Sequence, residues 1–220
     1  MTEEERMQQG DRMDVAFVLY PRMTALDLVG PYEVLGHQPE VTAHFVAASP
    51  EPVRTDAGLT IVPTTTFDAL DRADVVVVPG GAGWAEVLAE GVVAAWLREV
   101  HPTATWTTSV CSGSTLLAQA GILDGRPATT HWALRDELAA LGAVVSTERV
   151  VVDGSVATGA GVSAGIDMAL TLVGRIWGDE RARFTQLVIE YDPDPPYRTG
   201  SPERAPAELV AFARGLFAAG

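Results

Sequence analysis

Lysine is absent from the 220-residue chain, and all 15 basic residues are arginine. Without a lysine amine, the protein cannot form a Schiff base with a carbonyl substrate or use lysine as a general base. Cysteine occurs only once, at position 111. A single cysteine excludes an intrachain disulfide and a cysteine-based zinc site, and a free thiol suits a reducing compartment. We therefore expect a cytoplasmic protein.

The chain also lacks a long apolar run, since no stretch approaches the roughly 20 residues of a membrane span. Its net charge of −14 disfavours nucleic acid and anionic membranes as partners. The first twelve residues, MTEEERMQQGDR, have no apolar core of the kind found in signal peptides, and they predict a disordered leader. The length and the 47% hydrophobic content fit one folded domain, residues 13–220.

The stretch around the single cysteine predicts a strand, a sharp turn and a helix. Residues 105–110 carry the Thr, Trp and Val side chains typical of a buried strand, and a helical pattern runs from Ser112 to Gly121. Cys111 lies at the junction, where the helix N-terminus favours a thiolate and the small residues Ser112 and Gly113 permit a tight turn. A lone cysteine is more often an inert buried side chain. Its place in this junction nevertheless favours a nucleophile.

Asp27 is the second candidate for catalysis. Residues 13–20 predict a buried strand, and LDLVGPYEVLG, residues 26–36, predicts a short helix. Because Gly30 and Pro31 are poor residues for a helix interior, we expect the helix to begin near Pro31 and Asp27 to lie on the loop before it. A solvated loop aspartate or a helix cap is the simpler interpretation. The apolar neighbours of Asp27 favour a functional carboxylate, since an unpaired charge there is costly.

A glycine-rich turn follows the buried strand at residues 74–79. Its sequence is Gly-Gly-Ala-Gly, residues 80–83, and such turns present backbone N–H groups to an anion or to developing negative charge. Gly81 and Ser112 are the candidates for this role. The turn can equally be a tight connection between a strand and a helix, and it lacks the spacing of a nucleotide-binding loop.

Strands and helices alternate along the remaining chain. Strand patterns cover residues 42–49, 59–63, 143–146, 149–152 and 156–158, a strand or loop covers 127–132, and helical patterns cover 84–100, 134–141, 163–177, 179–190 and 206–219. This order predicts an α/β fold with a mostly parallel sheet, helices on both faces, and active residues at the carboxyl ends of strands.

The four histidines are scattered along the sequence, so we expect no metal site. His131 is a possible partner for the cysteine, although a structural role beside Trp132 is the preferred interpretation. Glu33 is interpreted as an ordinary helix residue.

Several segments resemble a known family. LDLVGPYEVL, VPGGAG, TSVCSGSTLLAQAGILDGRPATTHW, GAGVSAGIDMALTL and IEYDPDPPYRTGSP together are similar to the PfpI-type superfamily related to class I glutamine amidotransferases, and within it to the isonitrile (isocyanide) hydratases. The similarity extends over nearly the whole chain from residue 13. It implies a flavodoxin-like sandwich, a homodimer, and no metal or organic cofactor.

The resemblance also implies a mechanism. The family's nucleophile corresponds to Cys111 and its acidic partner to Asp27, which together would hydrate R–N≡C to an N-substituted formamide through a thioimidate on the cysteine. Family members commonly have Thr after the nucleophile, whereas this chain has Ser112. Peptidase-like relatives have His at that position, so its absence argues against proteolysis.

Two other function classes are compatible with the same fold. The domain is similar to the N-terminal part of some AraC-type regulators, which would make it a non-enzymatic sensing module. The acidic charge and the lack of a helix-turn-helix within these 220 residues weigh against that expectation. The second of these classes is a redox or glyoxal-handling thiol protein, although such relatives typically have Glu rather than Asp near the cysteine.

Overall fold

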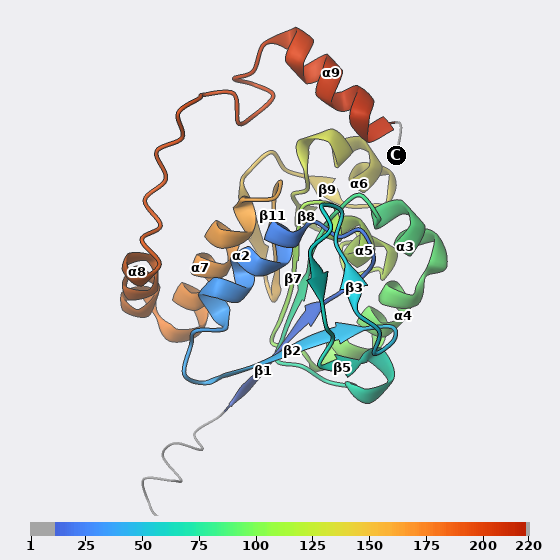
Figure 1. The fold of residues 1–220 in the computed structure, drawn as a ribbon, viewed down its shortest axis with the longest axis vertical. Helices are drawn as coiled ribbons and strands as arrows, with labels where there is room; N and C mark the ends of the chain where they lie inside the picture. Colours follow the sequence, from blue (N-terminus) through green and yellow to red (C-terminus); the bar gives the residue numbers. More distant parts are fainter. Residues whose placement is uncertain (1–11, 219–220) are drawn as a thin grey trace, which may run out of the picture.

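A computed structural model describes residues 12–218 of the chain (Figure 1). The disordered leader predicted for residues 1–12 therefore lies outside the described residues, except for Arg12. The strands of the main sheet are β1 (Met13–Val18), β2 (Val41–Ala47), β5 (Thr65–Thr66), β6 (Val75–Val78), β7 (Trp106–Val110), β10 (Val150–Asp153) and β11 (Val156–Gly159). The helices are α2 (Ala25–Leu35), α3 (Trp84–Glu90), α4 (Val92–Val100), α5 (Gly113–Gln119), α6 (Arg135–Ala140), α7 (Ala164–Trp177), α8 (Asp179–Val188) and α9 (Ala207–Ala218).

The main sheet has the strand order β10-β11-β7-β6-β1-β2-β5. All its pairings are parallel except that of β10 with β11. The interior strand β6 is four consecutive valines with no solvent exposure, as expected for a parallel strand buried on both faces. The helices α2 and α7 cover one face of the sheet, with α8 packed against α7, and α3, α4 and α5 lie on the other face (Figure 1). The predicted flavodoxin-like α/β fold is confirmed.

Short elements complete the fold at the rim of the sheet. They are the hairpin β3 (Val53–Arg54) and β4 (Thr60–Ile61), the parallel pair β8 (Pro127–Ala128) and β9 (Val144–Val145), and the 3₁₀ turns η1 (Phe67–Ala69), η2 (His101–Thr103) and η3 (Trp132–Leu134). The hairpin folds back onto the loop after β1, because the Arg22 N–H donates to the Arg54 carbonyl at 2.9 Å. This contact brings the turn between β3 and β4 to the carboxyl edge of the sheet.

The single helix predicted for residues 84–100 is wrong, because the structure has two helices there. Gly91 separates α3 from α4 and adopts a φ of 71°, a left-handed conformation that glycine reaches without steric cost. The apolar stripe continues across the break, so the periodicity of the sequence did not reveal it.

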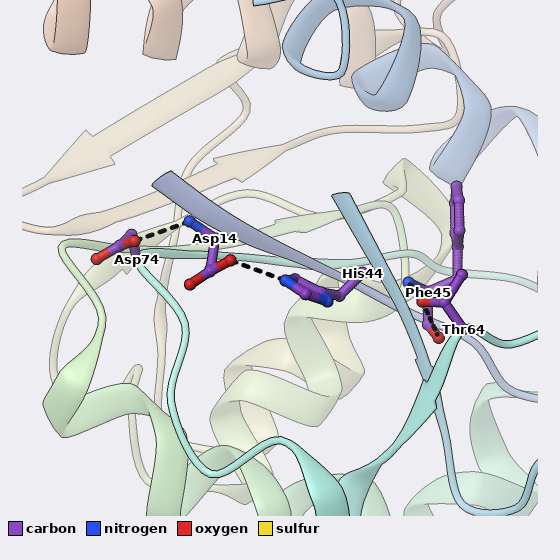
Figure 2. Close-up of polar contacts among 5 residues, drawn as sticks. All are labelled: Asp14, His44, Phe45, Thr64 and Asp74. Atoms are coloured by element: carbon purple, nitrogen blue, oxygen red, sulfur yellow. Dashed lines mark hydrogen bonds and ion pairs between the residues drawn. The ribbon is translucent and has the colours of Figure 1, made fainter. Parts of the chain in front are cut away.

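The amino-terminal edge of the sheet is held by ordinary polar contacts (Figure 2). His44 Nε2 on β2 lies 2.8 Å from Asp14 Oδ1 on β1, and the Asp14 N–H donates to Asp74 Oδ2 at 2.8 Å. Further along β2, the Phe45 N–H donates to Thr64 Oγ1 at 2.8 Å. These groups are partly or fully exposed and join neighbouring strands.

The chain after α8 runs as an extended segment away from the sheet and then forms α9 (Figure 1). Its start is held where Tyr191 Oη donates to Asp167 Oδ2 on α7 at 3.0 Å. The helix presents Leu209, Phe212 and Leu216 largely to solvent. Within residues 12–218, every helix is too short or too polar to cross a bilayer.

Candidate functional site

Cys111 lies in the predicted turn between β7 and α5. Its φ of 57° is uncommon for a residue with a side chain. The conformation is held by hydrogen bonds on both sides of the residue: the Cys111 N–H donates to the Ala160 carbonyl at 2.8 Å, and Thr130 Oγ1 donates to the Cys111 carbonyl at 2.9 Å. Backbone strain of this kind is characteristic of functional turns. The predicted elbow geometry is therefore present.

Two glycines allow the elbow to sit tightly on the end of β6. A Cβ atom at Gly80 would lie 2.5 Å from the Ser112 nitrogen, and one at Gly113 would lie 2.3 Å from the Val78 carbonyl oxygen. Neither position tolerates a side chain without a backbone shift. The glycine-rich turn and the cysteine turn are thus packed directly against each other.

Val162 is a part of the site that the sequence did not reveal. It has a φ of 31°, an outlier for a β-branched residue. This conformation directs its backbone N–H toward the Cys111 sulfur, which also interacts with the N–H of Ser112. The available signal was the Gly-Ala-Gly sequence just before Val162, between the predicted strand at 156–158 and the predicted helix at 163–177.

Asp27 lies in the first turn of α2 and has no solvent exposure, so the expectation of a loop carboxylate is wrong. The helix continues through Gly30 and Pro31 because both pack tightly on α7. A Cβ at Gly30 would lie 3.1 Å from Ile166 Cγ1, and one at Gly165 would lie 3.1 Å from the Pro31 ring. Close packing between the two helices compensates for the weak local helix propensity.

The Asp27 carboxyl group is only half satisfied by hydrogen bonds. Its Oδ2 accepts the Gly80 N–H at 3.0 Å, whereas Oδ1 is buried and has no hydrogen-bond partner among the described residues. Burial raises the pKa of Asp27 to about 7, although the Gly80 N–H and the Cys111 thiol oppose the shift. Asp27 therefore gains and loses its proton near neutral pH.

The environment of Cys111 disfavours a thiolate. Burial, followed by the charge of Asp27, raises the pKa of the Cys111 thiol well above its ordinary value, and the N–H groups of Val162 and Ser112 only partly oppose this. The expectation that the helix N-terminus yields a resting thiolate is thus wrong, because desolvation outweighs the helix contribution. With Asp27 ionised, the proton of the pair resides on sulfur.

Ser112 and Gly81, the other two predicted site residues, lie together beside the cysteine. The Gly81 N–H donates to Ser112 Oγ at 3.0 Å, so this N–H is engaged within the protein and positions the hydroxyl. The Ser112 hydroxyl also interacts with Tyr20, whose Oη donates to the Pro79 carbonyl at 2.9 Å. The two turns are thereby connected by side chains as well as by close packing.

His131 lines the cavity beside Cys111. Its Nδ1 accepts the Ala133 N–H at 3.3 Å and so caps η3, and burial lowers its pKa to about 4. The imidazole is therefore neutral near pH 7. Glu33 lies on α2 beside the exposed His37, which agrees with its interpretation as an ordinary helix residue.

Cys111 and Ser112 line a cavity of about 290 Å³ at this edge of the sheet. Its walls also include Gly81, Val162 and His131, and Leu216 of α9 contributes to the lining. Asp56, at the turn of the β3–β4 hairpin, contributes a carboxylate that no sequence signal indicated. Within residues 12–218, no group of three His, Cys, Asp or Glu side chains is arranged to hold a metal ion.

The chain is similar to known proteins over most of its length. The DJ-1/PfpI family model matches residues 13–175, most of the chain. The protein belongs to the DJ-1/PfpI family. A THiJ/PfpI family protein from Pseudomonas syringae has the same fold, with a TM-score of 0.90 and 41% identity over 94% of this chain and 86% of the other.

Two of the proteins to which the chain is similar have different functions, one as an enzyme and one as a transcriptional regulator. The isonitrile hydratase of Pseudomonas putida is 44% identical over 202 residues, which span 92% of this chain and 89% of that protein, so the two are homologues. The HTH-type transcriptional regulator CdhR of Pseudomonas aeruginosa is 29% identical over 77% of this chain but only 52% of the regulator. The enzyme is thus matched over nearly its full length.

Proposed function

We propose that the protein is an isonitrile hydratase that converts R–N≡C to an N-substituted formamide, with Cys111 as nucleophile and Asp27 as general acid and base. The observation that carries the proposal is the buried Asp27 carboxyl group, which has an unpartnered oxygen and interacts with the chain's single thiol. Near-full-length similarity to the Pseudomonas putida enzyme supports the substrate class.

The first step adds the thiol across the terminal carbon of the isonitrile. Asp27 takes the proton from Cys111 and delivers it to that carbon as sulfur attacks, so one C–S bond and one C–H bond form and no atom leaves. The product is a thioimidate, R–N=CH–S, attached to Cys111. A carboxyl group with a pKa of about 7 suits this transfer, because it both accepts and releases a proton near neutral pH.

The second step hydrolyses the thioimidate. Asp27, ionised again after the first step, takes a proton from the attacking water and passes it to the thioimidate nitrogen, so the water adds across the C=N bond to give R–NH–CH(OH)–S. Loss of a proton from the hydroxyl and cleavage of the C–S bond release R–NH–CHO, and the proton returns to sulfur or Asp27. Because Asp27 is fully buried, this water enters from the cavity that Cys111 lines.

Backbone groups around the sulfur assist both steps. The N–H groups of Ser112 and Val162 interact with the Cys111 sulfur and stabilise negative charge on it when it leaves. Gly81 acts indirectly, since its N–H holds the Ser112 hydroxyl. We assign no metal or organic cofactor to the reaction, because these steps need only proton transfer and water.

We also propose that the protein works as a homodimer in the cytoplasm. A reducing compartment would keep Cys111, the free buried cysteine, as a thiol. The exposed apolar residues of α8 and α9, among them Phe184, Leu187 and Phe212, offer surface that a second copy would cover. Sedimentation of the purified chain measures the oligomeric state.

Formamide production from p-nitrophenyl isocyanide tests the proposed function. We expect multiple turnovers by the reduced wild-type protein and none by Cys111→Ala. Full activity of Cys111→Ala would contradict covalent catalysis. Saturable binding without turnover by a folded wild type would favour a sensing module, a role consistent with the similarity to the regulator CdhR.

A further inference from the structure

Asp56 is the one carboxylate that lines the cavity at Cys111 within residues 12–218. The other lining side chains are apolar or uncharged, since His131 is neutral near pH 7. Asp56 comes from the turn of the β3–β4 hairpin and is exposed. The steps proposed above use Asp27 and do not use Asp56, which leaves its role open.

The Asp56 side chain is held in a fixed orientation. Thr24 Oγ1 donates to Asp56 Oδ2 at 2.6 Å, and the Ala57 N–H donates to Oδ1 at 2.7 Å. The Asp56 N–H donates to the Met23 carbonyl at 3.0 Å. Thr24 is the N-cap residue of α2, yet its side chain makes no capping bond to the helix and binds Asp56 instead. These contacts fix a carboxylate at the wall of the cavity.

Within residues 12–218, the Asp56 carboxylate has no ion-pair partner. The neighbouring Arg22 pairs with Glu86. The negative charge therefore acts on whatever occupies the cavity. It also reaches the catalytic pair, because it contributes to the raised pKa of Asp27.

We propose that Asp56 is a specificity-determining residue, which admits neutral and cationic isonitriles to the Cys111 cavity and rejects anionic ones. A carboxylate on the substrate would face a fixed like charge, whereas an ammonium group would be attracted to it. The same charge favours the protonated thioimidate over its neutral form. This inference rests on the proposed function and extends it to the class of isonitrile.

The test compares three aryl isonitriles that differ only in a para substituent: carboxylate, methyl ester and aminomethyl. We expect wild-type kcat/KM to be lowest for the carboxylate. In Asp56→Asn, kcat/KM for the carboxylate relative to the methyl ester should rise roughly fivefold, and the preference for the amine should fall by a similar factor. Asparagine retains acceptor and donor groups for Ala57 and Thr24, so the turn should fold normally.

Asp71→Asn is the matched control. Asp71 is exposed, lies just before β6 at the opposite edge of the sheet, and its loss changes the net charge by the same amount. The ratio of kcat/KM for the carboxylate to kcat/KM for the methyl ester should stay at the wild-type value in this variant. An equal change in both variants would assign the preference to the overall charge of −14 and overturn the role of Asp56.

A second measurement does not depend on isonitrile turnover. Because Cys111 is the single cysteine, every alkylated cysteine located by peptide mass mapping reports this cavity. Iodoacetate and iodoacetamide both form an S–C bond with loss of iodide, but only the former is an anion. We expect the ratio of iodoacetate to iodoacetamide rates to rise roughly fivefold in Asp56→Asn and to stay unchanged in Asp71→Asn.

The two measurements separate the possible failures. One result is a wild type that fails to turn over isonitriles while the ratio of iodoacetate to iodoacetamide rates still depends on Asp56. That result would reject the proposed function and support selection by charge at Asp56. The opposite result is turnover of the neutral isonitrile with no change in Asp56→Asn, either in the kcat/KM ratio of carboxylate to methyl ester or in the ratio of the two alkylation rates. It would reject charge selection by Asp56 and leave the proposed hydratase function in place.

Discussion

Asp27 and Asp14 lie at opposite ends of the same parallel sheet, and their surroundings differ in nearly every respect. Asp14 is half exposed and pairs with His44 at 2.8 Å (Figure 2). Asp27 is fully buried, has one oxygen without a hydrogen-bond partner among residues 12–218, and has its pKa raised to about 7. The residues Arg22, Cys111 and Val162, all with positive φ, also surround the carboxyl edge. A strained backbone and a buried carboxyl group with an unpartnered oxygen thus occur together at the end of the sheet that has the cavity, within residues 12–218.

The largest difference between the two aspartates should appear in catalysis. Asp27→Asn removes the proton-transfer group, and we expect kcat/KM to fall by roughly 1,000-fold. Asp14→Asn should change it by about twofold at most, since the side chain is remote from the cavity. Steady-state formamide production measures both. Comparable losses in the two variants would contradict a special role for the buried carboxylate.

The pH dependence of kcat/KM should sharpen the same comparison. The reactive form of the pair carries one proton, shared between Asp27 and Cys111, so kcat/KM should rise as pH increases through about 7 and then level off. This limb should vanish in the residual activity of Asp27→Asn and persist in Asp14→Asn. A profile that falls through pH 7 would show that the doubly protonated pair is the reactive form.

We expect Asp27→Asn to raise the free energy of unfolding and Asp14→Asn to lower it. The unfolded Asp27 loses its proton near pH 3.8 and the folded one near pH 7, so the folded state binds more protons between these values and its stability falls as pH rises. This loss amounts to about 4 kcal/mol above pH 7. Asp27→Asn removes it and should raise the free energy of unfolding by about 2–4 kcal/mol in mildly alkaline buffer.

Asp14→Asn is the control in the same denaturation experiment. It removes one partner of a partly exposed ion pair and should lower stability by less than about 1 kcal/mol. Destabilisation by Asp27→Asn in alkaline buffer would mean that the Asp27 carboxylate is favourably solvated in the folded protein, contrary to its burial.

The smallest expected difference is in stability, between two hydroxyl groups that each accept a hydrogen bond from a backbone N–H. Ser112 Oγ accepts the Gly81 N–H in the buried site, and Thr64 Oγ1 accepts the Phe45 N–H at the exposed surface (Figure 2). Ser112→Ala leaves a buried donor unpaired and should cost about 1–3 kcal/mol of stability. Thr64→Ala should cost less than about 1 kcal/mol because water replaces the hydroxyl. Urea denaturation of the two variants tests this order.

The sequence predicted the features that depend on local pattern. The valine run of β6, the junction at Cys111 and the alternation of strands and helices were sufficient for the fold. The errors arose where contacts between distant segments override local preference. Packing of Gly30 and Pro31 on α7 extends α2 over Asp27, and burial by the surrounding fold keeps the Cys111 thiol protonated. Asp56 reaches the cavity only because its hairpin folds onto the loop after β1.

The central claim is that Cys111 forms a covalent thioimidate with help from Asp27. Intact-mass measurement of the protein, quenched in acid shortly after mixing with an isonitrile, tests it most directly. We expect a mass increase equal to the whole isonitrile, located on Cys111 and absent from Cys111→Ala, that disappears as formamide is released. Formamide release by the wild type with no adduct at any mixing time, together with turnover by Cys111→Ala, would contradict the account.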